Sequence, residues 1–162
     1  VCIMNQCLLL RSRRVLMECV MRLNGELLNT DTLTQVIALM GKSPIHKVWS
    51  YSDVVNIIAP PIQLGQYITA KNGDEVLGYA SWAWLSIRAQ DVFISRSRKL
   101  LPADWNSGPC LWIMDVLTVE DYNPGLMMRK LRKVFLEQTT ANKCLYRREY
   151  SDGREVIKEM KR

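Results

Sequence analysis

The sequence predicts an α+β fold, in which helices flank one mostly antiparallel, twisted sheet. Three observations lead to this class: a helical period in the first readable stretch, an Asn-Gly turn between two strand-like stretches, and the order strand, helix, strand in the second half. The 162 residues are enough for one domain with a sizeable core and too few for two ordinary domains. We therefore expect a single domain over residues 31–162, preceded by an N-terminal extension, 1–30, without a clear period.

The first helix is predicted over the stretch "NTDTLTQVIALMG". Thr32 and Gln35 have the spacing of a capping box, and Gly41 stands where the helix is expected to stop. The apolar residues expected on its buried face are Leu33, Val36, Ile37 and Met40. A second, short helix is predicted over 51–58, where the pair Pro60-Pro61 would end it.

A hairpin is predicted next, because "QYITA" and "EVLGYASWAWL" flank the turn "KNGD", and Asn-Gly is the strongest short hairpin signal. A helix over about 87–101 follows it, and the loop "PADWNSGP" then leads into the strand "CLWIMDVLTV". The turn "DYNPG" opens a basic amphipathic helix whose apolar stripe is Met127, Leu131, Val134 and Phe135. A last strand, "KCLYRREY", turns at 151–153 into a charged tail.

The composition points to a negatively charged partner, because the formal net charge is +6. Nucleic acid, an anionic membrane surface and an acidic carrier protein would all suit. Since no helix-turn-helix or RNA-binding signature is present, nucleic acid is not expected. No stretch approaches the roughly 18 consecutive apolar residues of a membrane helix, and the start lacks a signal-peptide pattern, because its arginines follow its short apolar run. We therefore expect a cytoplasmic protein without a membrane segment.

The cysteines fit the same compartment. There are five, an odd number at irregular spacing, which opposes a disulfide framework. With a single histidine and no CxxC pair, the sequence predicts no metal site.

The candidate chemical groups are His46, the only histidine, and Asp115. Imidazole exchanges protons near neutral pH, but a lone histidine in a loop is more often structural. Asp115 interrupts an apolar strand, where a carboxylate is costly to bury unless it is paired, so it either faces solvent or orients a partner. Ser43 could hydrogen-bond the His46 ring. A Ser-His-Asp hydrolase is conceivable, but the sequence has no GxSxG elbow.

Two further sets of residues admit both an ordinary and a functional interpretation. Trp82 and Trp84 share one strand face, either for packing in the core or a dimer, or as a wall for a long apolar ligand. The basic side chains of the amphipathic helix form a solvated face or dock an acidic macromolecule; they are Arg129, Lys130, Arg132 and Lys133. No Gly-rich phosphate loop and no CoA-type glycine pattern is present.

Six short stretches also occur, in the same order, in a known family. They are "SPIHKVW", "PPIQLGQY", "YASWAWLS", "ADWNSG", "WIMD" and "MRKLRK". On these motifs the sequence resembles the toxin-activating acyltransferases, which modify repeats-in-toxin (RTX) protoxins of Gram-negative bacteria. The motifs span about Leu33 to Lys133, with a weaker match as far as the turn "YSDGR".

The resemblance implies a GNAT-like single domain and an enzyme, a protein-lysine acyltransferase that activates the toxin. Such proteins bind no cofactor of their own and take a fatty acyl group from the phosphopantetheine of acyl carrier protein. They transfer it to the ε-amino groups of internal protoxin lysines. The expected partners are therefore acyl carrier protein, RTX protoxin and a second copy of the chain, in the bacterial cytoplasm.

Carried over by motif, the family's histidine falls on His46, its aspartate on Asp115 and its supporting serine on Ser43. A lysine amine is protonated at neutral pH and must lose a proton before it attacks a thioester. We expect His46 to be the general base and Asp115 to hold its ring in the right tautomer. An acyl-enzyme route stays open. The basic helix would dock acyl carrier protein, which is strongly acidic, and Trp82 and Trp84 would line the acyl channel.

Other classes of function stay open on the sequence alone. One is a non-enzymatic basic binding module, either a toxin chaperone or a nucleic-acid binder, for which His46 would be dispensable. Another is a GNAT-like enzyme that uses acetyl-CoA, which CoA binding would reveal.

Overall fold

The computed structural model describes residues 30–43, 45–150 and 152–162, so nearly all of the predicted extension lies outside the described residues. The centre of the fold is a five-stranded sheet with the order β1-β2-β3-β4-β5. Its strands are β1 (Tyr67–Asn72), β2 (Glu75–Leu85), β3 (Cys110–Thr118), β4 (Lys143–Glu149) and β5 (Glu155–Lys161). Neighbours pair antiparallel except β3 and β4, which are parallel. The predicted α+β class with a mostly antiparallel sheet is confirmed.

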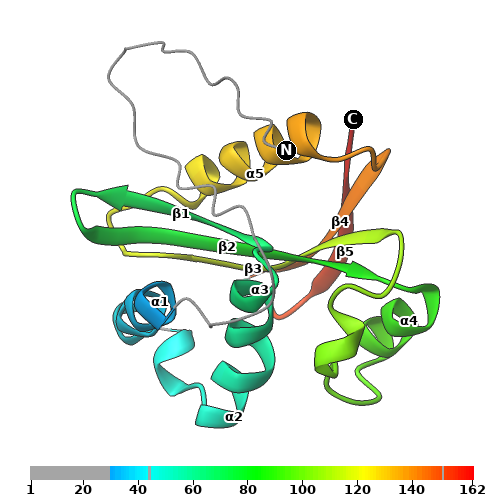
Figure 1. Cartoon of the computed structure of the whole chain (residues 1–162), viewed down its shortest axis with the longest axis horizontal. Helices are drawn as coiled ribbons and strands as arrows, with labels where there is room; N and C mark the ends of the chain where they lie inside the picture. The colour runs from blue at the N-terminus through cyan, green and yellow to red at the C-terminus, as the bar shows by residue number, and fades with distance from the viewer. Residues whose placement is uncertain (1–29, 44, 151) are drawn as a thin grey trace, which may run out of the picture.

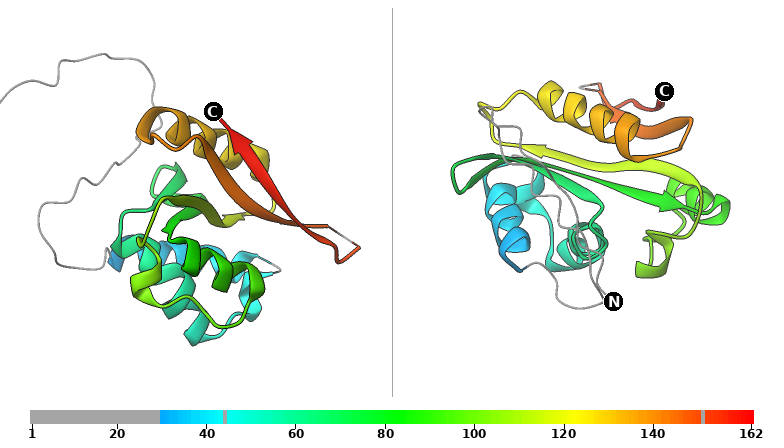
Figure 2. Two further views of the ribbon diagram at one scale, coloured as in Figure 1. Left: turned by 90° about the vertical axis from the view of Figure 1, so that its right-hand side faces the viewer. Right: turned by 45° about the horizontal axis from the view of Figure 1, so that its top comes forward.

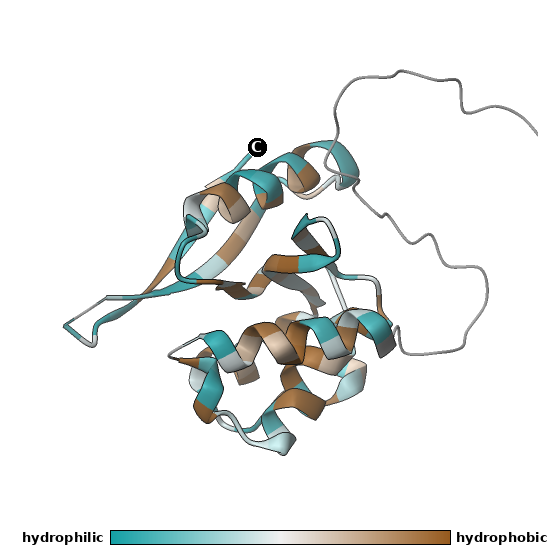
Figure 3. Cartoon of the chain, turned by 90° about the vertical axis from the view of Figure 1, so that its left-hand side faces the viewer, coloured by the Kyte–Doolittle hydropathy of each residue, from teal (hydrophilic) through white to brown (hydrophobic). Residues whose placement is uncertain are grey.

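Helices cover both faces of the sheet (Figure 1). On one face lie α1 (Thr30–Lys42), α2 (Tyr51–Asp53), α3 (Ala59–Gln63) and α4 (Ile87–Ser95), and on the other lies α5 (Pro124–Gln138). The turned views of Figure 2 keep the two layers apart, and Figure 3 shows that the helices carry both apolar and polar residues. The core accordingly divides into apolar clusters beneath α1–α4 and another beneath α5.

The first helix differs from the prediction at its start and on its buried face. Because α1 begins at Thr30, Thr32 lies inside its first turn, and the predicted capping box is wrong. Ile37 is 45% exposed, whereas the buried residue of that turn is Leu39. The helical period of apolar residues allows either Ile37 or Leu39 on the buried face, and the way α1 packs on the sheet places Leu39 there.

The pair Pro60-Pro61 begins a helix instead of ending one. A π-helical segment, η2 (Val54–Ile58), connects α2 to α3, and the Ala59 N–H donates to the Val54 carbonyl. Both prolines then lie in the first turn of α3, where a missing N–H costs little, and both are buried. The predicted stop at these prolines is therefore wrong.

The hairpin is confirmed, with Asn72 opposite Glu75 and Gly73 at a φ of 58°. The next helix, α4, ends earlier than predicted, because Arg96 adopts a left-handed conformation with a φ of 54°. The charged tail is a correction too, since residues 155–161 form β5 along the whole of β4. Nearly all side chains of this strand are exposed, and its charged residues do not lie at alternate positions, so its sequence lacks the period of a strand with one buried face.

The amphipathic helix α5 matches its prediction, and all four residues of its predicted apolar stripe are buried against the sheet. Across the part of the chain that is described, no helix is long and apolar enough to cross a membrane.

A β-bulge in the middle of β3 organises the centre of the sheet. The consecutive residues Ser81 and Trp82 of β2 stand opposite Asp115 and Ile113 of β3, so β3 carries one extra residue, Met114. Residues two apart on a strand normally share a face. Here the bulge turns Asp115 toward the α1 face and leaves Ile113 beneath α5.

The sheet also opens at this point. β3 pairs with β4 only from Leu111 to Ile113, opposite residues 144–146. Beyond the bulge, the remaining part of β3 keeps β2 as its ladder partner and has no paired residue on β4. From Met114 onward, the edge of β3 that faces β4 therefore has no strand paired to it.

Gly108 packs too closely on the end of β2 to accept a side chain. A Cβ there would lie 2.5 Å from the Ser86 Cα and 2.9 Å from the Leu85 carbonyl oxygen, both of which are backbone atoms. We expect Gly108→Ala to lower the free energy of unfolding by about 1–3 kcal/mol, because the backbone must shift to relieve the overlap. Urea denaturation monitored by circular dichroism measures the change.

Gly41 provides the matched control, because it lies in the last turns of α1 and a Cβ there meets nothing within 4 Å. Gly41→Ala should raise the free energy of unfolding by about 0.5–1 kcal/mol, since alanine favours the helix. Equal midpoints for the two variants would contradict this account of Gly108.

Candidate active site

His46 sits in a short turn held beneath the sheet. It begins η1 (His46–Val48), directly after α1. The Ser43 N–H donates to the Met40 carbonyl at 3.0 Å, and the Lys47 N–H donates to the Ser43 carbonyl at 3.0 Å. The imidazole is 6% exposed, and its ring centre is 4.6 Å from that of Trp49. These main-chain bonds hold the turn that carries His46, and Trp49 packs beside its ring.

The structure brings the three predicted residues into one hydrogen-bonded chain. The Ser43 Oγ is 2.8 Å from the His46 Nδ1, and the His46 Nε2 is 3.1 Å from the Asp115 Oδ1. The Asp115 side chain is only 12% exposed, so it does not point freely into solvent. The sequence left two alternatives for Asp115, to face solvent or to orient a partner. The structure shows the second, and the partner is His46.

The direction of the hydrogen bonds follows from what each group can donate. An ionised carboxylate only accepts, so the neutral ring donates its Nε2–H to Asp115. The Nδ1 then has a free lone pair and accepts from the Ser43 hydroxyl. In serine hydrolases the carboxylate binds Nδ1 and the serine binds Nε2, so the two ring nitrogens are exchanged here.

Two buried hydroxyl groups that the sequence analysis missed lie beside Asp115. Ser81 stands directly opposite Asp115 in the β2–β3 ladder, and both Tyr79 and Ser81 are 0% exposed. Burial raises the pKa of Tyr79, the Ser81 hydroxyl opposes that shift, and the charge of Asp115 adds to it. Tyr79 therefore stays a neutral phenol near the carboxylate. The alternation of side chains along β2 predicts that Tyr79 and Ser81 share a face. Only the pairing of β2 with β3 shows that they lie near Asp115.

A long groove opens from His46 and Asp115 toward the gap between β3 and β4. Its other walls come from α5, β4 and β5, and its cationic lining residues are Arg129, Arg132, Arg147, Arg148, Lys161 and Arg162. Ser43 is buried and does not line the groove, so it lies behind the imidazole as seen from this space. Of the three residues in the hydrogen-bonded chain, His46 and Asp115 therefore face this space.

The four basic residues predicted to act together on α5 divide into two pairs. Arg129 and Arg132 line the groove, and both are exposed. Lys130 and Lys133 do not line it, and the Lys133 Nζ lies 3.9 Å from the Glu137 carboxylate. The helical period separates the pairs, because residues three apart share a face.

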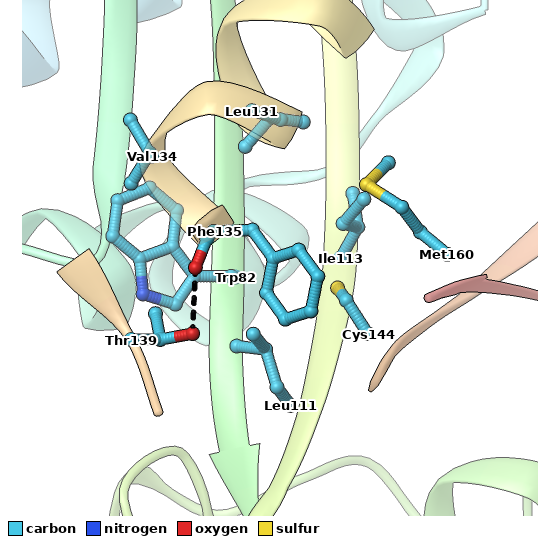
Figure 4. Close-up of a pocket in the computed structure, with 9 residues that line it drawn as sticks. All are labelled: Trp82, Leu111, Ile113, Leu131, Val134, Phe135, Thr139, Cys144 and Met160. Atoms are coloured by element: carbon cyan, nitrogen blue, oxygen red, sulfur yellow. Dashed lines mark hydrogen bonds between the residues drawn. The ribbon is translucent and has the colours of Figure 1, made fainter. Parts of the chain in front are cut away.

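Trp82 and Trp84 share a face of β2, as predicted, but they line different spaces. Both pack against the apolar cluster beneath α5. Trp82 lines an apolar crevice between α5 and the sheet (Figure 4). Trp84 lines a separate shallow hollow with Asn106 and Asn142. The structure therefore offers only Trp82 to the crevice.

Cys144 is a nearby nucleophilic atom that is held in an inactive form. Burial raises the pKa of its thiol to about 12, so almost none of it ionises at neutral pH. A thiol needs its ionised form to attack a thioester, and Cys144 therefore makes a poor acyl acceptor. Among the described residues, no three His, Cys, Asp or Glu side chains are placed to hold a metal ion.

With this geometry established, comparison with known proteins identifies the class. The sequence model of the HlyC family, the RTX toxin acyltransferases, matches residues 26–161. The chain therefore belongs to the RTX toxin acyltransferase family.

Individual relatives agree with the family. The leukotoxin-activating lysine-acyltransferase LtxC of Aggregatibacter actinomycetemcomitans is 31% identical over 107 residues, which are 66% of this chain and 63% of LtxC. The protein-lysine myristoyltransferase HlyC of Escherichia coli is 30% identical over 108 residues, 67% of this chain and 63% of HlyC. The toxin-activating lysine-acyltransferase ApxIIC of Actinobacillus pleuropneumoniae is 31% identical over 85 residues, 52% of this chain and 53% of ApxIIC. The chain thus spans between about half and five-eighths of these relatives.

One solved structure, titled "The crystal structure of acetyltransferase", aligns with a TM-score of 0.38 and 13% identity over 75% of each chain. A similarity at this level carries no argument about fold or activity.

The hydrogen-bonded chain makes a specific prediction for the imidazole. We expect the neutral ring to carry its proton on Nε2, because Asp115 can only accept there. Long-range proton–nitrogen correlation spectra at a pH where the ring is neutral distinguish the two tautomers. Asp115→Ala should weaken the preference while Ser43→Ala leaves the proton on Nε2. A dominant Nδ1–H form in the unmodified protein would contradict the arrangement.

Proposed function

We propose that the chain is a protein-lysine fatty acyltransferase. It moves a fatty acyl chain from acyl carrier protein to internal lysine ε-amines of an RTX protoxin and so activates the toxin. The observation that carries the proposal is the buried Ser43–His46–Asp115 chain at the end of a basic groove. The relatives named as toxin-activating lysine-acyltransferases supply the substrate class.

His46 suits the central task, which is to move a proton. In the transfer, the neutral lysine amine attacks the thioester carbonyl, the nitrogen loses a proton, and the pantetheine sulfur leaves as a thiol. His46 accepts this proton on Nδ1, the nitrogen that carries none in the neutral ring. Because Nδ1 faces Ser43 on the buried side of the ring, the proton reaches it through water or through the Ser43 hydroxyl after the turn that carries Ser43 moves. The proton then passes to the leaving sulfur, so the ring returns to its starting form.

Asp115 supports this cycle by stabilising the charged ring. When Nδ1 takes a proton, the imidazole becomes a cation 3.1 Å from the Asp115 Oδ1. At 12% exposure water screens this pair only partly, so the attraction between the carboxylate and the imidazole cation is stronger than it would be in bulk water. It also keeps the ring from turning and so fixes which nitrogen is left to take the proton.

Direct transfer fits this geometry better than an acyl-enzyme route. The Ser43 hydroxyl is the nucleophile that such a route would need, but Ser43 is 6% exposed and lies behind the ring. The Cys144 thiol is un-ionised because burial raises its pKa to about 12. His46 and Asp115 face the groove directly, so amine and thioester can meet beside the base.

The groove suits a donor that carries its thioester on a phosphopantetheine arm attached to an acidic protein. Arg129 and Arg132 present guanidinium groups along it, and such groups bind phosphate and carboxylate well. The fatty acyl group is therefore brought by the carrier protein and needs no resident cofactor. We place this reaction in the bacterial cytoplasm, and a homodimer remains a prediction from the resemblance.

Replacing His46 should abolish transfer without unfolding the chain. We expect His46→Gln, which keeps hydrogen-bonding groups but cannot act as a base, to lower the rate at least about 100-fold. Ser43→Ala should cost less, up to roughly tenfold, because it removes one neutral hydrogen bond. The assay is intact-mass spectrometry of protoxin fragments incubated with fatty acyl-acyl carrier protein, and urea midpoints report folding.

The same assay separates the alternatives. No acyl increment on any fragment from the folded, unmodified protein would exclude the enzyme and favour a binding protein. Transfer by His46→Gln at the unmodified rate would exclude His46 as the base. An acyl adduct on the acid-quenched enzyme that disappears in Ser43→Ala would replace direct transfer with an acyl-enzyme.

The two pairs of cations on α5 give a second test. Arg129→Glu with Arg132→Glu should raise the KM for acyl-acyl carrier protein at least about tenfold at low salt, and added salt should reduce the difference. Lys130→Glu with Lys133→Glu changes the net charge equally but lies off the groove, so we expect a smaller effect. Initial rates at two ionic strengths measure both. Equal KM values for the two double variants would contradict docking along the groove.

A further inference from the structure

An apolar crevice lies between α5 and the sheet, on the face opposite His46 (Figure 4). Four of its residues come from α5 or the turn after it, and five come from four different strands. They are Leu131, Val134, Phe135 and Thr139, with Trp82, Leu111, Ile113, Cys144 and Met160. The cavity between them is about 20 Å³, enough for about one water molecule, so a longer ligand must push its walls apart.

The lining is apolar apart from the Trp82 indole N–H, the Thr139 hydroxyl and the Cys144 thiol. The Thr139 hydroxyl donates to the Phe135 carbonyl at 2.8 Å, as the dashed line in Figure 4 marks. The Cys144 sulfur is turned toward the Leu145 carbonyl at 3.8 Å, and burial keeps the thiol neutral. A ligand with several hydrogen-bonding groups would lose most of its bonds to water here without replacement. The chemistry of the crevice therefore selects a plain hydrocarbon chain.

The crevice adjoins the groove that His46 and Asp115 line. Ile113 and Met160 line both spaces. Because of the bulge at Met114, Ile113 faces the crevice while Asp115, two positions later, faces the imidazole. β4 leaves β3 at the same point, so a chain can pass around the open edge of β3 from one face of the sheet to the other.

We propose that this crevice receives the distal part of the donor's acyl chain and sets which chain lengths are transferred. The inference rests on the proposed acyltransferase function and adds the binding site for the hydrocarbon. With the thioester beside His46, only a chain long enough to pass Ile113 reaches the crevice. Each methylene buried there strengthens binding by up to roughly fourfold, so longer chains are favoured until the crevice is filled.

Met160 lies where the crevice and the groove meet. The crevice is narrow, so its walls must part to admit a chain. Met160 is half-buried on the edge strand β5, and an unbranched thioether changes rotamer readily. Phe135, by contrast, is 4% exposed in the fixed stripe of α5. We therefore assign the movable wall to Met160 and the fixed wall to Phe135.

A binding experiment tests the crevice without catalysis. The probe is myristate with a bromine atom near its methyl end, because bromine quenches tryptophan fluorescence only at short range. We expect saturable quenching in the unmodified protein and in Trp84→Phe, with most of it lost in Trp82→Phe. Trp84 is the matched control, since it lies on the same strand and face but lines another hollow. No quenching, or equal quenching in both variants, would overturn the proposal.

A kinetic experiment tests the length preference. Val134→Phe fills the crevice, so the ratio of kcat/KM for 14-carbon over 8-carbon acyl-acyl carrier protein should fall at least tenfold. Val92→Phe makes the same change on α4, in the cluster on the opposite face, and should leave the ratio unchanged. Simple destabilisation would lower both rates together and leave the ratio as it was.

The two experiments fail separately from the proposed function. If the unmodified protein transfers neither chain, the acyltransferase proposal fails, while the quenching of Trp82 still reports whether the crevice takes a hydrocarbon. If transfer occurs and Val134→Phe keeps the ratio, the crevice is ordinary core and the chain lies elsewhere.

Discussion

The pairing of β2 with β3, and the one extra residue within it, is the constraint on which the rest of the molecule depends. Without the bulge at Met114, the alternation of side chains would turn Ile113 and Asp115 toward the same face. One of the two would then be misplaced, either the carboxylate in the apolar cluster beneath α5 or the isoleucine against the imidazole. The bulge also lies where the pairing of β3 with β4 ends, so one irregularity places Asp115 and Ile113 on opposite faces at the point where these two strands part.

The parts of the fold that follow from local periodicity could be predicted from the sequence. The buried stripe of α5 and the Asn-Gly hairpin depend on neighbours along the chain, and both are present. The errors concern choices that tertiary packing makes. The prolines at 60 and 61 are accommodated by a π-helical turn that precedes them, and β5 is held by the backbone of β4 although its own side chains are mostly exposed. Neither feature has a period in the sequence.

The candidate site could be predicted as a set of residues but not as an arrangement. The motifs name Ser43, His46 and Asp115, whereas their hydrogen-bond directions depend on where the ring nitrogens meet the sheet. Tyr79 and Ser81 escaped notice, because a hydroxyl in an apolar strand carries no signal until the register of its neighbour is known. The four basic residues of α5 were predicted to act together for a similar reason. Only the position of the groove, which the sequence does not give, divides them into two pairs.

The distance along the chain between His46 and Asp115 has a consequence for how the protein is made. The two residues are 69 positions apart, and the whole meander from β1 to β3 lies between them. Closing so long a loop costs entropy that only the completed strand pairing repays. His46 is also synthesised before Asp115, so a chain that ends before β3 cannot join the two. The hydrogen-bonded chain from Ser43 through His46 to Asp115 therefore forms together with the native sheet, and a misassembled copy lacks it.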